Sequence, residues 1–188
     1  MPVRREKITP EEFIKLFTET ALERGQFAKM YEELAAAIPE AELSDKHFCE
    51  FLVLSLFIDC LCLGWTFNGE AAAKLRDLYV KKIMSEPGTA RPAYGRPGPV
   101  TCEREFKRIL DERFSEYQQV ASGISCINID TQKTLDSLTK LGETFSRHFI
   151  GHESLETILK VKWFFLMKED ILYEKFLKGI KQDYELVL

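Results

Sequence analysis

The chain has 188 residues, of which 45% are hydrophobic and 30% are charged, and its formal net charge is −4 at pH 7. These proportions are those of an ordinary globular protein, and they exclude a disordered chain. The net negative charge also argues against nucleic-acid binding, which normally leaves a basic excess. We therefore expect a folded protein with no nucleic-acid partner.

The N-terminal half shows the spacing of four helices. The first begins after the cap residue Thr9, with the acidic residue three positions later completing a capping box. A short second helix follows over about 26–38. The third begins after the cap Ser44 and ends near Leu63, and it is apolar almost all round, which is typical of a central helix covered on several sides. The fourth begins after Asn68.

A Pro/Gly-rich segment interrupts the chain over residues 86–100. It holds four of the seven prolines, and it also holds three glycines. Both residue types break helices, so this segment is the one clear linker. We expect a single helical domain over 1–188. The alternative is a division into four helices over 1–85 and three helices over 101–188.

Three further helices follow the linker. The second of these begins after the cap Asp130, and Gly151 ends it. The last begins after Ser154 and extends to near Tyr184, a length of roughly 30 residues that is unusual for a globular protein. It contains no proline, and we expect Gly179 to be its only weak point.

No segment shows the period-two alternation of a strand. The predicted fold is therefore all-α, a compact bundle of about seven helices with a Pro/Gly-rich crossover loop near 86–100. The apolar stretch 51–67 is shorter than the ~20 residues of a membrane span and carries Asp59 near its middle, so we expect no span. The five cysteines lack the spacing of a metal site, which predicts reduced thiols and a cytoplasmic location.

The histidines offer only a weak metal site. His148, His152 and Glu156 are spaced so that they would share one face of a continuous helix. Gly151 is expected to break that helix, and His148 then lies in a last turn where cations are favourable. The chain also lacks the motifs of nucleophilic or metal-dependent catalysis. We therefore expect no metal, no cofactor and no catalytic residue, although the sequence leaves enzymatic activity open.

Asp59, Trp65 and Trp163 are weak candidates for lining a ligand pocket. Asp59 either faces the interior as a buried acid or lies on a stripe that contacts water or an ion-pair partner. The second interpretation is favoured, because unpaired carboxylates are rarely buried. Large aromatic side chains can leave an apolar pocket in a helical bundle, but they fill a core equally well.

The last helix carries five large apolar residues in a row, at 163–167. Five consecutive positions spread around the whole helix, so either the helix is central or its outer side contacts another chain. The candidate interface residues are Trp163, Phe164, Phe165 and Met167.

Two functions are compatible with these patterns. We expect a non-catalytic helical protein-interaction module that binds a protein partner or a second copy of itself, as a homodimer formed through the last helix. The alternative is a small-molecule binding protein or enzyme with an apolar pocket inside the bundle, near Trp65 or Trp163.

Overall fold

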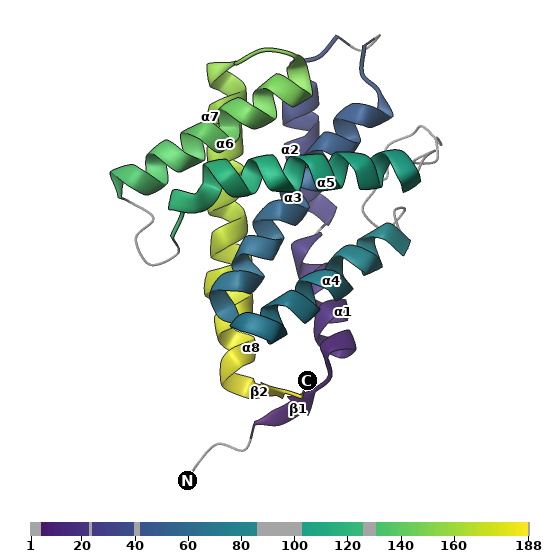
Figure 1. Ribbon diagram of the computed structural model, residues 1–188, viewed down its shortest axis with the longest axis vertical. Coiled ribbons are helices and arrows are strands. Elements are labelled where there is room, and N and C mark those ends of the chain that lie inside the picture. The colour runs from purple at the N-terminus through teal and green to yellow at the C-terminus, as the bar shows by residue number, and fades with distance from the viewer. Residues whose placement is uncertain (1–4, 23, 40–41, 86–102, 126–130, 188) are drawn as a thin grey trace.

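The structure is a computed structural model, and it describes residues 5–22, 24–39, 42–85, 103–125 and 131–187. Within these ranges the chain is an all-α bundle with one very short sheet (Figure 1). The prediction of an all-helical bundle is therefore confirmed. The crossover loop near 86–100, the cap Asp130, and the cysteines Cys102 and Cys126 lie outside the described residues.

The described residues form seven helical segments, counting the last one as continuous. The first six are α1 (Pro10–Ala21), α2 (Arg24–Ala35), α3 (Asp45–Thr66), α4 (Gly69–Ser85), α5 (Glu103–Val120) and α6 (Gln132–Ile150). A 3₁₀ turn, η2 (Ala121–Gly123), extends α5. The last segment consists of α7 (Leu155–Lys168), the π-helical segment η3 (Glu169–Leu177) and α8 (Lys178–Asp183).

Local capping groups set several helix ends where the sequence predicts them. The Thr9 hydroxyl accepts from the backbone N–H of Glu12, whose carboxylate accepts from the N–H of Thr9, as expected for a capping box. Ser154 caps α7 through its hydroxyl, which accepts from the backbone N–H of Thr157. Gly151 ends α6 with a φ of 85°, a left-handed conformation that favours glycine.

Two predicted details are corrected. The N-cap of α6 is Thr131, one residue after the predicted cap, and its hydroxyl accepts from the N–H of Thr134. The last helix loses its α-helical geometry at Glu169 rather than at Gly179, which lies inside α8. The π-helical segment begins where the charged side chains of Lys168 and Glu169 enter the interior, and the pattern of apolar residues does not reveal this.

The helix α3 is the centre of the bundle. Every residue from Phe48 to Cys60 is buried, because α3 packs against α4, α5, α6 and η3 (Figure 1). By length and composition α3 could also cross a membrane, but 83% of the apolar window is buried inside the structure, as in a core helix. The buried side chains of helices before and after the linker form one hydrophobic cluster.

A short parallel sheet joins the two ends of the described chain. The strands β1 (Glu6–Ile8) and β2 (Tyr184–Leu186) pair with Glu6 opposite Tyr184, at the lower end of Figure 1. Neither strand is predicted by the pattern of the sequence. Three residues are too few to show an alternating pattern. The sheet forms because the last helix ends beside the N-terminal segment.

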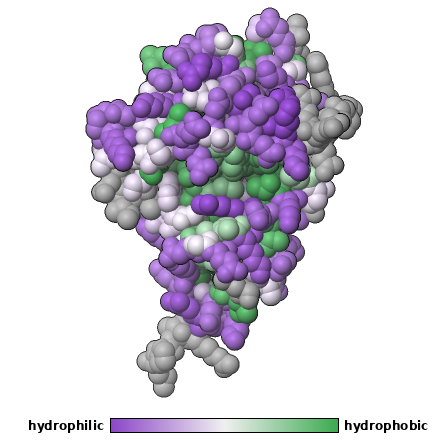
Figure 2. Space-filling model, in the orientation of Figure 1, coloured by the Kyte–Doolittle hydropathy of each residue, from purple (hydrophilic) through white to green (hydrophobic). Residues whose placement is uncertain are grey.

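The helix α7 lies on α6 at very short range. A Cβ atom at Gly142 of α6 would lie only 3.1 Å from the backbone of Ile158 of α7, so this glycine permits the close approach. The contact fixes which side of α7 faces the core. On the face of the molecule drawn in Figure 2, hydrophilic side chains predominate around a central apolar patch.

Candidate functional site

Asp59 lies at the centre of a buried ionic cluster. One carboxylate oxygen accepts from the ammonium group of Lys168 at 2.6 Å, and the other accepts from the hydroxyl of Tyr79 at 2.7 Å. Lys168 also donates to the backbone carbonyl of Ala21 at 2.8 Å. Asp59 is completely buried and therefore does not face water. One set of side chains thus connects α1, α3, α4 and α7.

The interior location changes the acidity of the groups in this cluster. Burial raises the pKa of Asp59, while the Lys168 ammonium and the Tyr79 hydroxyl oppose that rise. Burial also raises the pKa of the neighbouring Cys60 thiol to about 12 and that of Cys62 well above its usual value. Both thiols therefore stay protonated at neutral pH and are poor nucleophiles.

The space beside this cluster is too small for a ligand. A cavity of about 10 Å³ adjoins Lys168, between side chains that include Phe27 and Phe164. This volume is that of a single water molecule. We conclude that the Asp59 cluster stabilises the arrangement of four helices, and that it offers no room for a small molecule.

The two tryptophans lie in different environments. Trp65 is half-buried and packs edge-on against Phe165 and Tyr173, with ring centroids at 6.1 and 5.8 Å. Trp163 is exposed on the outer side of α7. Trp65 therefore fills the space between α3 and the last helix, while Trp163 is a surface residue.

One side of α7 presents a row of exposed apolar side chains, which we call the α7 stripe. It consists of Leu155, Leu159, Trp163 and Leu166, with exposed fractions of 72%, 54%, 54% and 41%. Their spacing of three or four residues places them along one face of the helix. Of the eight large exposed hydrophobic residues in the described chain, these four share one short helix. Their concentration marks the stripe as a candidate binding surface.

Two of the predicted interface residues lie on the opposite side of α7, which faces the core. Phe164 and Phe165 are fully buried, and Phe164 contacts Phe51 of α3 at a centroid distance of 5.2 Å. Both belong to the core, so the prediction that they form an interface is wrong. Met167 is half-buried beside the small cavity at Lys168. Trp163 is the candidate that lies clearly on the surface.

The three weak metal candidates do not converge. The Nε2 of His148 lies 2.7 Å from a carboxylate oxygen of Glu116, and Glu156 pairs with Lys160 at 2.8 Å. His152 is exposed beyond the end of α6. Among the residues that the structure describes, no group of three potential ligands could hold a metal ion.

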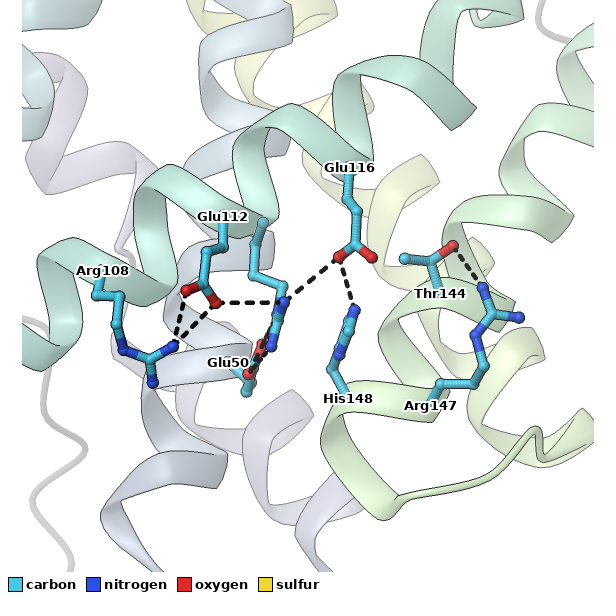
Figure 3. A network of polar contacts seen from close by, with 8 residues as sticks. Glu50, Arg108, Glu112, Glu116, Thr144, Arg147 and His148 are labelled. Atoms are coloured by element: carbon cyan, nitrogen blue, oxygen red, sulfur yellow. Dashed lines mark hydrogen bonds and ion pairs between the residues drawn. The ribbon is translucent and has the colours of Figure 1, made fainter.

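His148 instead belongs to a polar network that joins three helices (Figure 3). The buried carboxylate of Glu50 on α3 accepts from Nε and Nη2 of Arg113 on α5, at 3.0 and 3.2 Å. Arg113 also lies 3.4 Å from Glu116, which bridges to His148 on α6. The network therefore ties α3 to α5 and α6.

Sequence reasoning missed Lys168 and the leucines of the α7 stripe. The spacing of Leu155, Leu159 and Trp163 places them on one helical face. The predicted interface instead followed the uninterrupted apolar run at 163–167, whose residues are neighbours in sequence and point in different directions. Nothing in the sequence indicates Lys168, whose partner on α3 is 109 residues away.

No family model matches this chain, and no curated protein and no solved structure is significantly similar to it.

Proposed function

We propose that this protein is a non-catalytic helical interaction module that self-associates through the α7 stripe. The observation that supports the proposal is the exposure of Leu155, Leu159, Trp163 and Leu166 along one face of α7. Monomeric proteins rarely expose a contiguous apolar surface of this kind without a binding function. Tryptophan is also among the residue types most often found at the centre of interfaces.

A second copy of the chain fits the shape of this surface. The stripe is straight and lies on one helix, so two α7 helices related by a twofold axis can pack antiparallel with each stripe covering the other. Trp163 lies between Leu159 and Leu166 and would then meet leucines of the partner. Charged residues lie beside the stripe, including the Glu156–Lys160 ion pair, and they would form a polar rim.

The alternative of an apolar ligand pocket inside the bundle has less support. The cavity at Lys168 has a volume of about 10 Å³. Ligand pockets usually have volumes of roughly 300 Å³ or more. The thiols of Cys60 and Cys62 are free and buried, which is compatible with the proposed cytoplasmic location.

Light scattering after size exclusion tests self-association. We expect the wild-type mass to rise with concentration from 21.8 kDa toward twice that value. The variant Leu166→Glu should remain monomeric, because it places a charge in the apolar interface. Leu135→Glu on α6 is the matched control, since Leu135 and Leu166 are both 41% exposed. The control should associate as the wild type does.

Fluorescence provides an independent measurement. Trp163 is exposed in the monomer, so its emission should shift to shorter wavelength as the protein associates, and replacing Trp163 with Phe should remove the shift. A wild-type protein that stays monomeric at high micromolar concentration would show that the stripe does not bind a second copy. Equal effects of Leu166→Glu and Leu135→Glu would show that the association uses another surface.

A further inference from the structure

All three histidines of the chain line one polar cleft. The cleft has a volume of about 320 Å³ and lies between the turn that precedes α3 and the C-terminal end of α6. Its nitrogen-bearing side chains are Lys46, His47, Arg147, His148 and His152. In Figure 1 this end of the molecule lies opposite α8 and the small sheet. The α7 stripe contributes none of these side chains, so the cleft is a separate feature.

The hydrogen bonds of His47 determine which ring nitrogen carries its proton. The backbone N–H of Ser44 donates to Nδ1 of His47 at 3.1 Å, so Nδ1 accepts and the proton of the neutral ring lies on Nε2. Burial lowers the pKa of His47, which keeps the ring neutral at pH 7. His47 therefore offers an N–H donor to the cleft.

Hydrogen bonds hold two of the side chains that α6 contributes to the cleft. The guanidinium of Arg147 donates to Glu153 at 2.6 Å and to the hydroxyl of Thr144 at 3.2 Å, and His148 is held by Glu116 (Figure 3). Support of this kind orients binding groups before a ligand arrives. These contacts fix the directions of the Arg147 and His148 side chains.

His47 is poorly arranged to bind a metal ion. A histidine that binds metal normally donates its other ring N–H to a carbonyl or carboxylate, whereas Nδ1 of His47 accepts a hydrogen bond from Ser44. Binding a metal through Nε2 would force a proton onto Nδ1, against the backbone N–H. The ligand that suits this set of groups is a hydrogen-bond acceptor.

Two cationic side chains and one carboxylate line the cleft. Lys46 and Arg147 carry permanent positive charge, and Lys46 lies in the first turn of α3, where the helix dipole is also positive. Glu42 is the carboxylate of the lining, and two further carboxylates contact lining residues, since Glu153 pairs with Arg147 and Glu116 contacts His148. An anion would therefore compete with Glu153 for the Arg147 guanidinium.

We propose that this cleft binds the phosphate group of a small phosphate monoester. Lys46 and Arg147 supply charge-assisted hydrogen bonds, and Nε2–H of His47 supplies a neutral one. A volume of about 320 Å³ exceeds that of the phosphate alone and leaves room for a small organic substituent. Ala37, Ile38 and Pro39 also line the cleft and offer apolar contacts to this substituent.

Calorimetric titration with inorganic phosphate at pH 7 and constant ionic strength tests the proposal. We expect one saturable site per chain. His47→Glu should abolish binding, because it removes a donor and adds a negative charge. This substitution is compatible with folding, since glutamate three residues after Ser44 forms a standard capping box. The matched control is Gln182→Glu, which adds the same charge on exposed α8 and should bind phosphate normally.

Two further variants separate the cleft from general surface attraction. Lys46→Gln should weaken phosphate binding about tenfold, as expected for one charge-assisted hydrogen bond, whereas Lys178→Gln on α8 should have no effect. Equal weakening by both would overturn the proposal, as would a wild-type protein that does not bind phosphate. Acetate binding as tightly as phosphate, or stoichiometric zinc binding that requires His47, would assign the cleft to another ligand class and also overturn it.

Discussion

The central helix α3 carries two fully buried carboxylates, and their surroundings differ. Asp59 is paired with Lys168, which is only 4% exposed, and it also accepts a hydrogen bond from Tyr79. Glu50 is paired with Arg113, which is 15% exposed and continues toward the surface through Glu116. The Asp59 cluster therefore closes inside the core, while the Glu50 network opens to solvent.

This difference shows how an apolar helix can carry acids. In both cases the cation comes from a helix on the other side of the Pro/Gly-rich segment, so each ion pair connects distant parts of the chain. A buried pair pays a large desolvation cost, and removing one partner is much more damaging than removing both. The loss of stability on removing one partner should be smaller for a pair that lies nearer to the solvent. Three substitutions at three depths test this.

The largest effect is expected for Lys168→Met. It leaves the carboxylate of Asp59 buried without its cation, and we expect the free energy of unfolding to fall by about 3–5 kcal/mol, measured by urea denaturation at pH 7. The double variant Lys168→Met/Asp59→Leu removes both charges and should recover most of that loss.

The pH dependence of the same variant provides a control. Burial already raises the pKa of Asp59, and without Lys168 that rise is less opposed. A raised pKa in the folded state means that stability is present at low pH and is lost as pH rises through that pKa. Lys168→Met should therefore be closest to the wild type in acid. A loss below about 1 kcal/mol at pH 7 would contradict the ion pair.

An intermediate effect is expected for Arg113→Met. The carboxylate of Glu50 loses its bidentate partner, but water can reach this edge of the bundle more easily than it can reach Asp59. We expect a loss of about 1–3 kcal/mol by the same measurement. The control is Lys175→Met, which breaks an exposed ion pair with Asp170 and should cost less than about 1 kcal/mol. A loss as large as that of Lys168→Met would show that depth does not matter.

The smallest effect is expected for Glu12, a fully exposed carboxylate. Hydrogen bonds from the backbone and side chain of Thr9 lower its pKa. A lowered pKa in the folded state means that the stabilisation is present above the unfolded pKa and is lost as pH falls through the folded one. Glu12→Gln should therefore reduce the dependence of stability on pH in the acid range. An unchanged slope between the two proteins would contradict the capping box.

The sequence by itself determined the helical class of this protein and several of its helix ends. Thr9, Ser154 and Gly151 act through hydrogen bonds or backbone angles within a few residues, so their effect can be recognised from neighbours in the chain. The continuous apolar composition of α3 likewise predicted a covered, central helix. These features are local, and local patterns are what a single sequence records.

Only the tertiary structure decided which side chains meet and which remain exposed. Asp59 and Lys168 are 109 residues apart, and the turn before α3 meets the end of α6 only after the bundle has formed. Within the run at 163–167, Phe164 lies in the core and Trp163 lies at the surface, because the close contact at Gly142 fixes the rotation of α7. Helical periodicity gives the spacing of a face, whereas packing against other helices decides its direction.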